Sequence, residues 1–224
     1  MRVRWLKILD ATAGFFLCWA TGYCLHLFRR QEAPVAARIE EVRRILVIRP
    51  GGMGDMILLQ PMLKSLRQHY PAAEIDLICE KRNQAIPALA GISVRVLLYD
   101  AHPFSFFQKL RRGRYDIAID SEQFHYFSAL MAILSRAPVR IGFKINPGRN
   151  TLYTHLVNYN LEGYEAGEFM RLLVPLGIKD EAVVKGCLSL SGRADERSRA
   201  VIIHVGGSSR YKHWETGKFV DLVK

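Results

Sequence analysis

One acidic residue stands at the end of a glycine-rich turn. Asp55 follows three glycines, Gly51, Gly52 and Gly54, and an apolar run occupies residues 45–48 just before them. Glycines leave no side chain between a ligand and the free backbone N–H groups at the start of a helix. A carboxylate beside such a turn can act as a general base, which takes a proton from a hydroxyl group and makes it a nucleophile.

Asp55 also has a purely structural interpretation. Aspartate is a favoured N-cap, and the dipole of a helix stabilises an ionised carboxylate at its first turn. The same dipole makes the carboxylate a weaker base, so the two roles oppose each other. Both interpretations are open at this point, and the helix cap is the more common role.

The glycine pattern was compared with two known nucleotide-binding turns. A P-loop requires a lysine after its last glycine, and none stands there. A dinucleotide fingerprint requires G-x-G-x-x-G; Gly52 and Gly54 match, but Ile57 takes the third place. Glu80 follows the next predicted strand, about where a carboxylate binds the ribose of NAD. An NAD-binding oxidoreductase domain therefore remains an alternative.

A second polar turn lies far downstream. The apolar segment 201–204 predicts a buried strand, and behind it stand Gly206, Gly207, Ser208, Ser209, Arg210 and Lys212. Backbone N–H groups, two hydroxyls and two cations at one strand end suit a diphosphate. A polar loop with exposed charges is the equally open alternative.

Alternating strands and helices must position these residues. The predicted strands are 45–48, 74–79, 93–99, 115–120 and 139–143, and the predicted helices are 55–66, 84–90, 104–112, 124–134 and 165–176. The polar segment 146–160 reads as a long loop. This alternation predicts an α/β fold with a parallel sheet, whose chemistry lies at the carboxyl ends of the strands.

Other polar residues fall near the same edge. Asp120 and Glu122 could bind a metal or share a proton, but strand-end aspartates usually shape turns, and we favour that role. His125 and Tyr126 could line an acceptor cleft or simply pack against neighbours.

Basic residues stand within the predicted loop 146–160 and just before it. Lys144, Arg149 and His155 could meet an anionic acceptor, and a solvated basic loop is at least as plausible.

The composition favours anionic partners. The 224 residues carry a formal net charge of +11, with 32 basic and 21 acidic residues, and half of the residues are hydrophobic. Such a surface suits a phospholipid, a phosphorylated glycolipid or a nucleotide. The sequence has no zinc-finger spacing, RNP motif or basic-region heptads, so nucleic acid is not favoured as a partner. The four cysteines form no CxxC pair, which indicates reduced thiols in a cytosolic setting.

The N-terminal segment is strongly apolar. Residues 11–28 carry no formal charge, which is close to the lower limit for crossing a bilayer. Gly14, Cys18 and Gly22 place a small residue at every fourth position, a spacing that allows close helix packing. Trp5, Trp19 and Tyr23 suit a membrane interface.

Basic residues flank this segment on both sides, at positions 2, 4 and 7 and at positions 29 and 30. No A-x-A cleavage site follows, which argues against a removable signal peptide. We expect either a helix packed on the domain or a membrane contact through residues 5–28, as an in-plane or marginally spanning anchor.

Two stretches resemble a known family. Residues 44–78, RILVIRPGGMGDMILLQPMLKSLRQHYPAAEIDLI, resemble the opening of the family 9 glycosyltransferases, the lipopolysaccharide heptosyltransferases. Residues 202–223, IIHVGGSSRYKHWETGKFVDLV, resemble the start of that family's second domain, with its Lys-x-Trp. Pro50 departs from the hydrophobic residue that is common in the family.

The resemblance implies a fold, a reaction and a location. The fold is the Rossmann-like N-terminal domain of a GT-B glycosyltransferase plus the first β-α unit of a second Rossmann-like domain. The reaction is inverting transfer of a heptose from a nucleotide-diphosphate sugar, ADP-heptose, to the lipopolysaccharide core at the inner face of the cytoplasmic membrane. No metal or cofactor is expected.

The resemblance also assigns roles to residues. Asp55 would deprotonate the acceptor hydroxyl beside the glycine turn, and Lys212 would stabilise the departing diphosphate. Ser208 and Ser209 would hold phosphate oxygens, within a donor-binding turn that runs from Gly206 to Arg210.

These expectations divide the chain into five parts. They are an apolar helix at 1–30, a linker at 31–43, an acceptor-side domain at 44–191, a linker at 192–199 and the start of a donor-side domain at 200–224. The donor-side part would be truncated. A non-catalytic module that binds the acceptor or another anion is therefore a second functional hypothesis.

Overall fold

The computed structural model describes residues 10–27, 41–101, 103–179, 201, 203–205 and 213–223. The chain divides into two compact units, Met1–Leu190 and Ser191–Lys224.

The first unit is built on one six-stranded sheet, in which every neighbouring pair of strands is parallel. The strands are β1 (Arg44–Ile48), β2 (Glu74–Cys79), β3 (Arg95–Leu98), β4 (Ile117–Asp120), β5 (Val139–Phe143) and β6 (His155–Val157). Their order, β3-β2-β1-β4-β5-β6, is that of a Rossmann-like sheet. The predicted α/β class and parallel sheet are confirmed.

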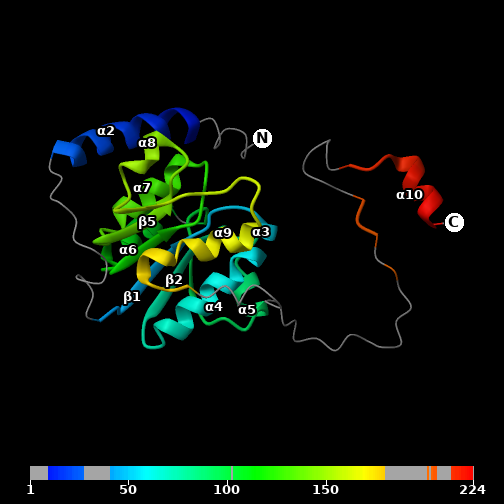
Figure 1. Cartoon of the computed structure of the whole chain (residues 1–224), viewed down its shortest axis with the longest axis horizontal. Helices are drawn as coiled ribbons and strands as arrows, with labels where there is room; N and C mark the ends of the chain where they lie inside the picture. The colour runs from blue at the N-terminus through cyan, green and yellow to red at the C-terminus, as the bar shows by residue number, and fades with distance from the viewer. Residues whose placement is uncertain are drawn as a thin grey trace. The chain divides into compact units, whose positions relative to one another are not determined.

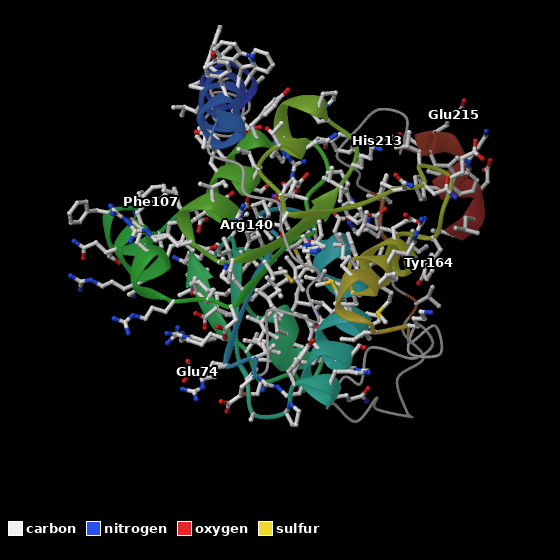
Figure 2. All side chains as sticks on the ribbon, turned by 60° about the vertical axis from the view of Figure 1, so that its left-hand side comes forward. Glu74, Phe107, Arg140, Tyr164, His213 and Glu215 are labelled. Carbon is white, nitrogen blue, oxygen red and sulfur yellow. The ribbon has the colours of Figure 1, made fainter. Side chains whose placement is uncertain are left out.

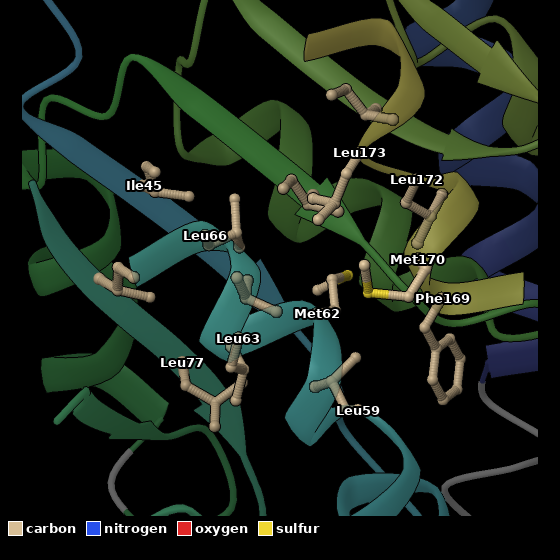
Figure 3. Close-up of a cluster of buried hydrophobic side chains, with 14 of the residues drawn as sticks. Ile45, Leu59, Met62, Leu63, Leu66, Leu77, Phe169, Met170, Leu172 and Leu173 are labelled. Carbon is tan, nitrogen blue, oxygen red and sulfur yellow. The ribbon is translucent and has the colours of Figure 1, made fainter. Parts of the chain in front are cut away.

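Helices cover both faces of this sheet (Figure 1). One layer consists of α3 (Met53–Leu58), α4 (Gln60–His69), α5 (Ile86–Leu89) and α9 (Glu165–Arg171), and the other contains α6 (Pro103–Arg112) and α7 (Tyr126–Leu134). Side chains of β1 alternate between the two layers, which is why all four residues 45–48 are apolar and buried. Figure 3 shows the first of these cores, in which Met62, Leu63 and Leu66 of α4 share a cluster with Phe169 of α9.

The helix predicted at 55–66 is in fact two helices. It breaks at Leu59, which is the C-cap of α3 and the N-cap of α4, and Pro61 stands in the first turn of α4. Proline has no backbone N–H, so it cannot make the bond to the carbonyl of Ile57 that would continue the helix. The apolar periodicity runs across the break because both helices bury the same side.

The prediction of a long loop at 146–160 is wrong. The segment contains a short helix, α8 (Pro147–Asn150), and the edge strand β6. Asn146 is the N-cap of α8, and its side chain accepts a hydrogen bond from the backbone N–H of Gly148. The helix predicted at 165–176 is also shorter, because α9 ends at Arg171 and a 3-10 turn occupies Val174–Leu176.

The apolar N-terminal segment forms a π-helical turn, Asp10–Gly14, followed by α2 (Phe15–Leu27). The turn and α2 together pack on α7 and α8 (Figure 1). A Cβ on Gly14 would lie 2.8 Å from Cβ of Tyr126, and one on Gly22 would lie 2.3 Å from Oγ1 of Thr151. Cys18, between them, is completely buried. The described part of the chain contains no helix with both the length and the apolar character needed to cross a membrane.

Two thiols can be assessed. Cys18 and Cys79 are free and buried, and burial raises the pKa of each to about 12. Neither is a reactive thiolate, in line with the expected reduced state.

The second unit contains the helix α10 (Thr216–Val223). The strand predicted at 201–204 is not found among the residues described there, 201 and 203–205. A strand requires a hydrogen-bonded neighbour, and the pairings of the described residues all lie within the first unit.

Candidate active site

Asp55 is held by a buried arginine that directly follows β1. Nη2 of Arg49 donates to Oδ2 of Asp55 at 2.6 Å. Nη1 of the same guanidinium donates to the backbone carbonyl of Ser121 at 2.7 Å and to Oε1 of Gln123 at 3.3 Å. Arg49 is only 4% exposed, whereas the side chain of Asp55 is 42% exposed. The carboxylate is therefore fixed on one side and remains accessible from solvent.

Asp55 is not the N-cap of its helix. α3 begins at Met53, its N-cap is Gly52, and no side chain caps it. Asp55 is the third residue of the helix, and its side chain turns back to Arg49. The N-cap position predicted for Asp55 is therefore wrong, although the carboxylate does lie in the first turn, where the helix dipole stabilises it.

The three glycines of the turn differ in what they require. Gly52 has φ 71°, which an L side chain rarely adopts, and a Cβ there would lie 2.1 Å from Oδ2 of Asp55. At Gly54 an added Cβ would meet nothing within 4 Å, and at Gly51 it would make only an ordinary contact with Arg82. Gly52 is thus the glycine that makes room for the Asp55–Arg49 pair.

This pair lies at the topological switch point of the sheet. β1 pairs with β2 on one side and with β4 on the other, and Ile48 is in register with Asp120. Arg49 continues β1, and the loop after β4 supplies Ser121 and Gln123. Open α/β sheets bind ligands outside the carboxyl ends of their strands at this point.

Helix α9 braces the guanidinium from the other side. The ring of Phe169 lies 5.2 Å from Cζ of Arg49, and the amide of Gln123 donates to Glu165. The hydroxyl of Tyr159 donates to the other oxygen of Glu165 at 2.5 Å. Burial, together with this hydrogen bond, raises the pKa of Tyr159 to about 12. A chain of hydrogen bonds therefore links Asp55 to polar side chains from four segments, those of Arg49, Gln123, Glu165 and Tyr159.

Sequence reasoning missed Arg49, Gln123 and Glu165. The available signal is a charged residue directly after a strand that is apolar throughout, because such a charge must find partners when the strand is buried. The partners themselves are far apart in the sequence. Gln123 stands 74 positions after Arg49, and Glu165 stands a further 42 positions after Gln123.

Asp120 and Glu122 have the structural role that we favoured. Asp120 is fully buried; it accepts hydrogen bonds from Arg149 at 2.9 Å and from the hydroxyl of Tyr153 at 2.6 Å. Burial raises the pKa of Asp120, and the charge of Arg149 partly opposes the rise. Glu122 shapes its own turn by accepting from the N–H groups of Gln123 and Phe124.

The other polar candidates have different surroundings in the structure. Arg149 is 1% exposed and paired with Asp120, so both the anion-binding and the solvated interpretation of this residue are wrong. Lys144 is exposed. Nδ1 of His155 lies 2.8 Å from Oγ1 of Thr154.

His125 and Tyr126 pack against the N-terminal segment. Nδ1 of His125 lies 3.1 Å from Oδ2 of Asp10, and the N–H groups of Tyr126 and Phe127 donate to the same carboxylate. The ring of Phe15 meets that of Tyr126 edge to face. These contacts favour the packing interpretation of the two residues.

Glu80, the residue on which the NAD alternative depends, is engaged in internal contacts. It accepts a hydrogen bond from the hydroxyl of Tyr99 at 2.7 Å and pairs with Arg82. Among the described residues, no three His, Cys, Asp or Glu side chains gather in a way that could hold a metal ion.

The structure describes none of the donor-side candidate residues. Gly206, Gly207, Ser208, Ser209, Arg210 and Lys212 lie outside the described residues. Within the second unit, an open apolar hollow is lined by residues of α10 and its approach, among them Trp214 and Phe219.

Comparison with known proteins gives one sequence relative and several similar folds. No model of a known protein family matches the chain. The chain is 27% identical over 196 residues to lipopolysaccharide heptosyltransferase 3 of Escherichia coli, a match that covers 76% of this chain and 56% of the relative.

Among solved structures, the E. coli heptosyltransferase WaaC with ADP superposes with a TM-score of 0.52 at 20% identity, covering 61% of this chain and 48% of WaaC. WaaC with ADP-2-deoxy-2-fluoro heptose gives 0.50 at 19% identity, covering 61% and 49%. The family 9 glycosyl transferase of Veillonella parvula gives 0.52 at 19% identity, covering 67% and 44%.

The solved structures establish the fold of the six-stranded unit, which is a Rossmann-like domain similar to one found in the heptosyltransferases. The chain spans about half the length of the relatives that it matches, 56% of the curated one and 48% of WaaC. The sequence match, the shared fold and the two stretches at 44–78 and 202–223 together relate this chain to the lipopolysaccharide heptosyltransferases of glycosyltransferase family 9.

Proposed function

We propose that this chain carries the acceptor side of a glycosyltransferase site, which transfers a heptose from ADP-heptose to the lipopolysaccharide core with inversion. The observation that carries the proposal is the accessible Asp55 carboxylate, held by buried Arg49 at the switch point of a heptosyltransferase-like sheet. That WaaC is described with ADP and with ADP-2-deoxy-2-fluoro heptose supports ADP-heptose as the donor.

In this mechanism Asp55 accepts the proton of the acceptor hydroxyl. The hydroxyl oxygen attacks the anomeric carbon of the heptose from the side opposite to the diphosphate. The new glycosidic bond forms as the bond from the anomeric carbon to the phosphate oxygen breaks, so the configuration inverts and ADP leaves. Arg49 keeps the Asp55 carboxylate in one orientation. Such alignment of a catalytic group with its substrate lowers the activation barrier.

Groups on the acceptor side and on the donor side of the reacting carbon both contribute to catalysis. The open turn at Gly51, Gly52 and Gly54 lets the acceptor sugar approach the backbone beside Asp55. On the donor side, Lys212 neutralises the charge that develops on the departing diphosphate, and the turn from Gly206 to Arg210 binds the phosphates. The acceptor is an anionic glycolipid, so the protein works at the inner face of the cytoplasmic membrane. The net charge of +11 suits such a surface.

The test is transfer by the chain itself. Purified protein is incubated with ADP-heptose and heptose-deficient lipopolysaccharide core, and ADP release and the mass of the core are measured. Asp55→Asn should lower the rate by about a hundredfold or more while the protein stays folded, because an amide cannot accept the proton. Glu74→Gln makes the same chemical change at the amino end of β2 and should leave the rate unchanged.

Two outcomes would contradict the proposal. Full activity of Asp55→Asn would remove Asp55 from the chemistry. Binding of the lipopolysaccharide core without any transfer by the unaltered chain would instead support the second hypothesis, a non-catalytic module that binds the acceptor.

A further inference from the structure

Helix α2 has two apolar faces, and only one of them is covered. The face that carries Gly14, Cys18 and Gly22 packs on α7 and α8. The opposite face is exposed and aromatic: Phe16 is 67% exposed, Trp19 62% and Tyr23 59%. In Figure 2 the blue helix stands at the outer edge of the first unit, and many of its side chains point away from the other elements.

These three aromatic residues form one ridge. They follow each other at spacings of three and four residues, which places them on the same side of a helix. The rings of Trp19 and Tyr23 are stacked, with centroids 6.0 Å apart and planes 15° apart. We call Phe16, Trp19 and Tyr23 the aromatic ridge.

A helix on the surface of a soluble protein normally carries charged residues on its outer face. Residues 11–28 carry none. Water-exposed aromatic rings in a row are costly unless something apolar covers them, and a contiguous exposed patch of this kind marks an interaction site. A surface of this kind serves to bind a partner.

We propose that this partner is a lipid bilayer, and that α2 lies parallel to it with the aromatic ridge inserted at the level of the headgroups. Tryptophan and tyrosine favour that level, because their rings are apolar and their N–H and O–H groups find water there. Basic residues flank the apolar run in the sequence at Arg2, Arg4, Lys7, Arg29 and Arg30, and they match anionic lipid headgroups in charge.

The contacts of α2 favour the in-plane orientation over a crossing one. The segment is held near its start, where the carboxylate of Asp10 accepts hydrogen bonds from the N–H groups of Tyr126 and Phe127. It is held further along where Gly22 packs on Thr151. Turning the helix upright would break these contacts.

The docked helix also connects the membrane to the candidate active site. Asp10 binds the first turn of α7, and the loop just before α7 contains Ser121 and Gln123, which hold Arg49. A bilayer under α2 would thus lie on a fixed side of the candidate active site. A glycolipid acceptor in that bilayer must reach this site. This consequence rests on the proposed function, whereas the membrane contact itself does not.

The first experiment measures partitioning of the chain onto vesicles by sedimentation. Vesicles of phosphatidylethanolamine and phosphatidylglycerol are the probe, without sugar donor or acceptor. Replacing the aromatic ridge, in the variant Phe16→Ser/Trp19→Ser/Tyr23→Ser, should lower the partition coefficient roughly a hundredfold, given the apolar area of three rings. Circular dichroism and urea unfolding establish that the variant is folded.

A matched control removes exposed aromatic rings elsewhere. Phe104 and Phe107 project from α6 (Phe107 is labelled in Figure 2), and Phe104→Ser/Phe107→Ser should bind vesicles like the unaltered chain. If this double variant loses binding and the ridge variant keeps it, α6 is the membrane surface and the proposal is overturned.

The second experiment tests the depth of insertion. In the variant Trp5→Phe/Trp214→Phe, Trp19 is the one remaining tryptophan, since the chain has three. Its fluorescence should be quenched more by lipids brominated near the headgroup than by lipids brominated near the end of the acyl chain. Stronger quenching by the deep label would overturn the in-plane orientation. A dimer without vesicles that the ridge variant abolishes would show that a second copy covers the ridge, and would overturn the proposal too.

The two proposals fail in different ways. Vesicle binding requires neither ADP-heptose nor the lipopolysaccharide core, and Asp55→Asn should bind vesicles normally. Loss of transfer with normal vesicle binding would count against the proposed function alone, and normal transfer to a soluble core fragment with no vesicle binding would count against the membrane contact alone.

Discussion

The guanidinium of Arg49 and the carboxylate of Asp55 meet at 2.6 Å although the two residues stand six positions apart in the sequence, and one is buried while the other is open to solvent. This pair joins the end of β1 to the first turn of α3. It fixes an accessible carboxylate against an arginine that the loop after β4 and the ring of Phe169 hold in place.

Replacing Arg49 should damage both stability and transfer. Arg49→Met keeps most of the volume of the side chain but leaves the carbonyl of Ser121 and the carboxylate of Glu122 without their cation, so the free energy of unfolding should fall by about 2–4 kcal/mol. Urea unfolding measures it. Arg43→Met removes an arginine whose pair with Glu41 is exposed on both sides, and it should leave the free energy of unfolding nearly unchanged. Equal losses in the two variants would show that Arg49 has no special role.

The two glycines beside Asp55 should respond differently to alanine. Gly52→Ala forces an L side chain to φ 71° and into contact with Oδ2 of Asp55, and it should cost about 1–3 kcal/mol and disturb the Asp55–Arg49 pair. Gly54→Ala is the control, because a Cβ there meets open space within α3, where alanine is the better helix former. We expect it to be neutral or slightly stabilising in thermal unfolding. A destabilised Gly54→Ala together with an unaffected Gly52→Ala would contradict this account of the turn.

Arg149 should prove essential to the core, with an effect that depends on pH. Arg149→Met leaves Asp120 buried without its cation, and the free energy of unfolding should fall by about 3–5 kcal/mol at pH 7. Burial already raises the pKa of Asp120, and loss of the arginine raises it further. A carboxyl group with a raised folded-state pKa keeps its proton to higher pH than in the unfolded chain. Stability therefore falls as pH rises through that range and returns as pH is lowered.

Urea unfolding of Arg149→Met at pH 7 and pH 5 tests the sign. Part of the loss should disappear at pH 5. The double variant Asp120→Asn/Arg149→Met carries no buried charge at this pair, so its deficit should be smaller and nearly independent of pH. A deficit of Arg149→Met that grows on acidification would be incompatible with the raised pKa of Asp120.

Asp10 should hold the N-terminal helix on the domain. Burial alone would raise the pKa of Asp10, but hydrogen bonds from His125, Phe127 and Tyr126 outweigh it, and the pKa lies below its usual value. The stabilisation from this carboxylate is present at neutral pH and is lost as pH falls through its lowered pKa.

Asp10→Ala removes these bonds and should cost about 1 kcal/mol, as the loss of a helix cap does. It should also speed tryptic cleavage on the C-terminal side of α2. Glu162→Ala, which removes an exposed carboxylate of the first unit, is the control. Unchanged cleavage of Asp10→Ala would mean that α2 is held by its small residues alone.

Much of the fold follows from the sequence because the relevant physics is local. A continuous apolar run such as 45–48 can only be a strand covered on both faces, and such runs alternating with amphipathic stretches require parallel β-α units. The same logic places Asp55 at the carboxyl edge of the sheet. Local signals were less successful at Pro61, where the apolar period continues through a break in the backbone hydrogen bonding.

The partners of buried charges could not be read from the sequence. Arg49 bonds to residues 72 and 74 positions away, and Asp120 pairs with Arg149 across 29. Such pairs depend on which strands become neighbours, here β1 beside β4 and β4 beside β5. Arg149 looked like a solvated or ligand-binding residue because its charge is visible in the sequence, whereas its burial is a property of the fold.

The N-terminal helix shows the same division. The residue types alone show that α2 is apolar all round and carries small residues at one spacing and aromatic residues at another. That the small residues face α7 and α8 and the aromatic ridge faces outward becomes visible in the folded chain. The reason is physical: side-chain type and period are encoded locally, but which face is buried is set by the shape of the surface against which the helix packs.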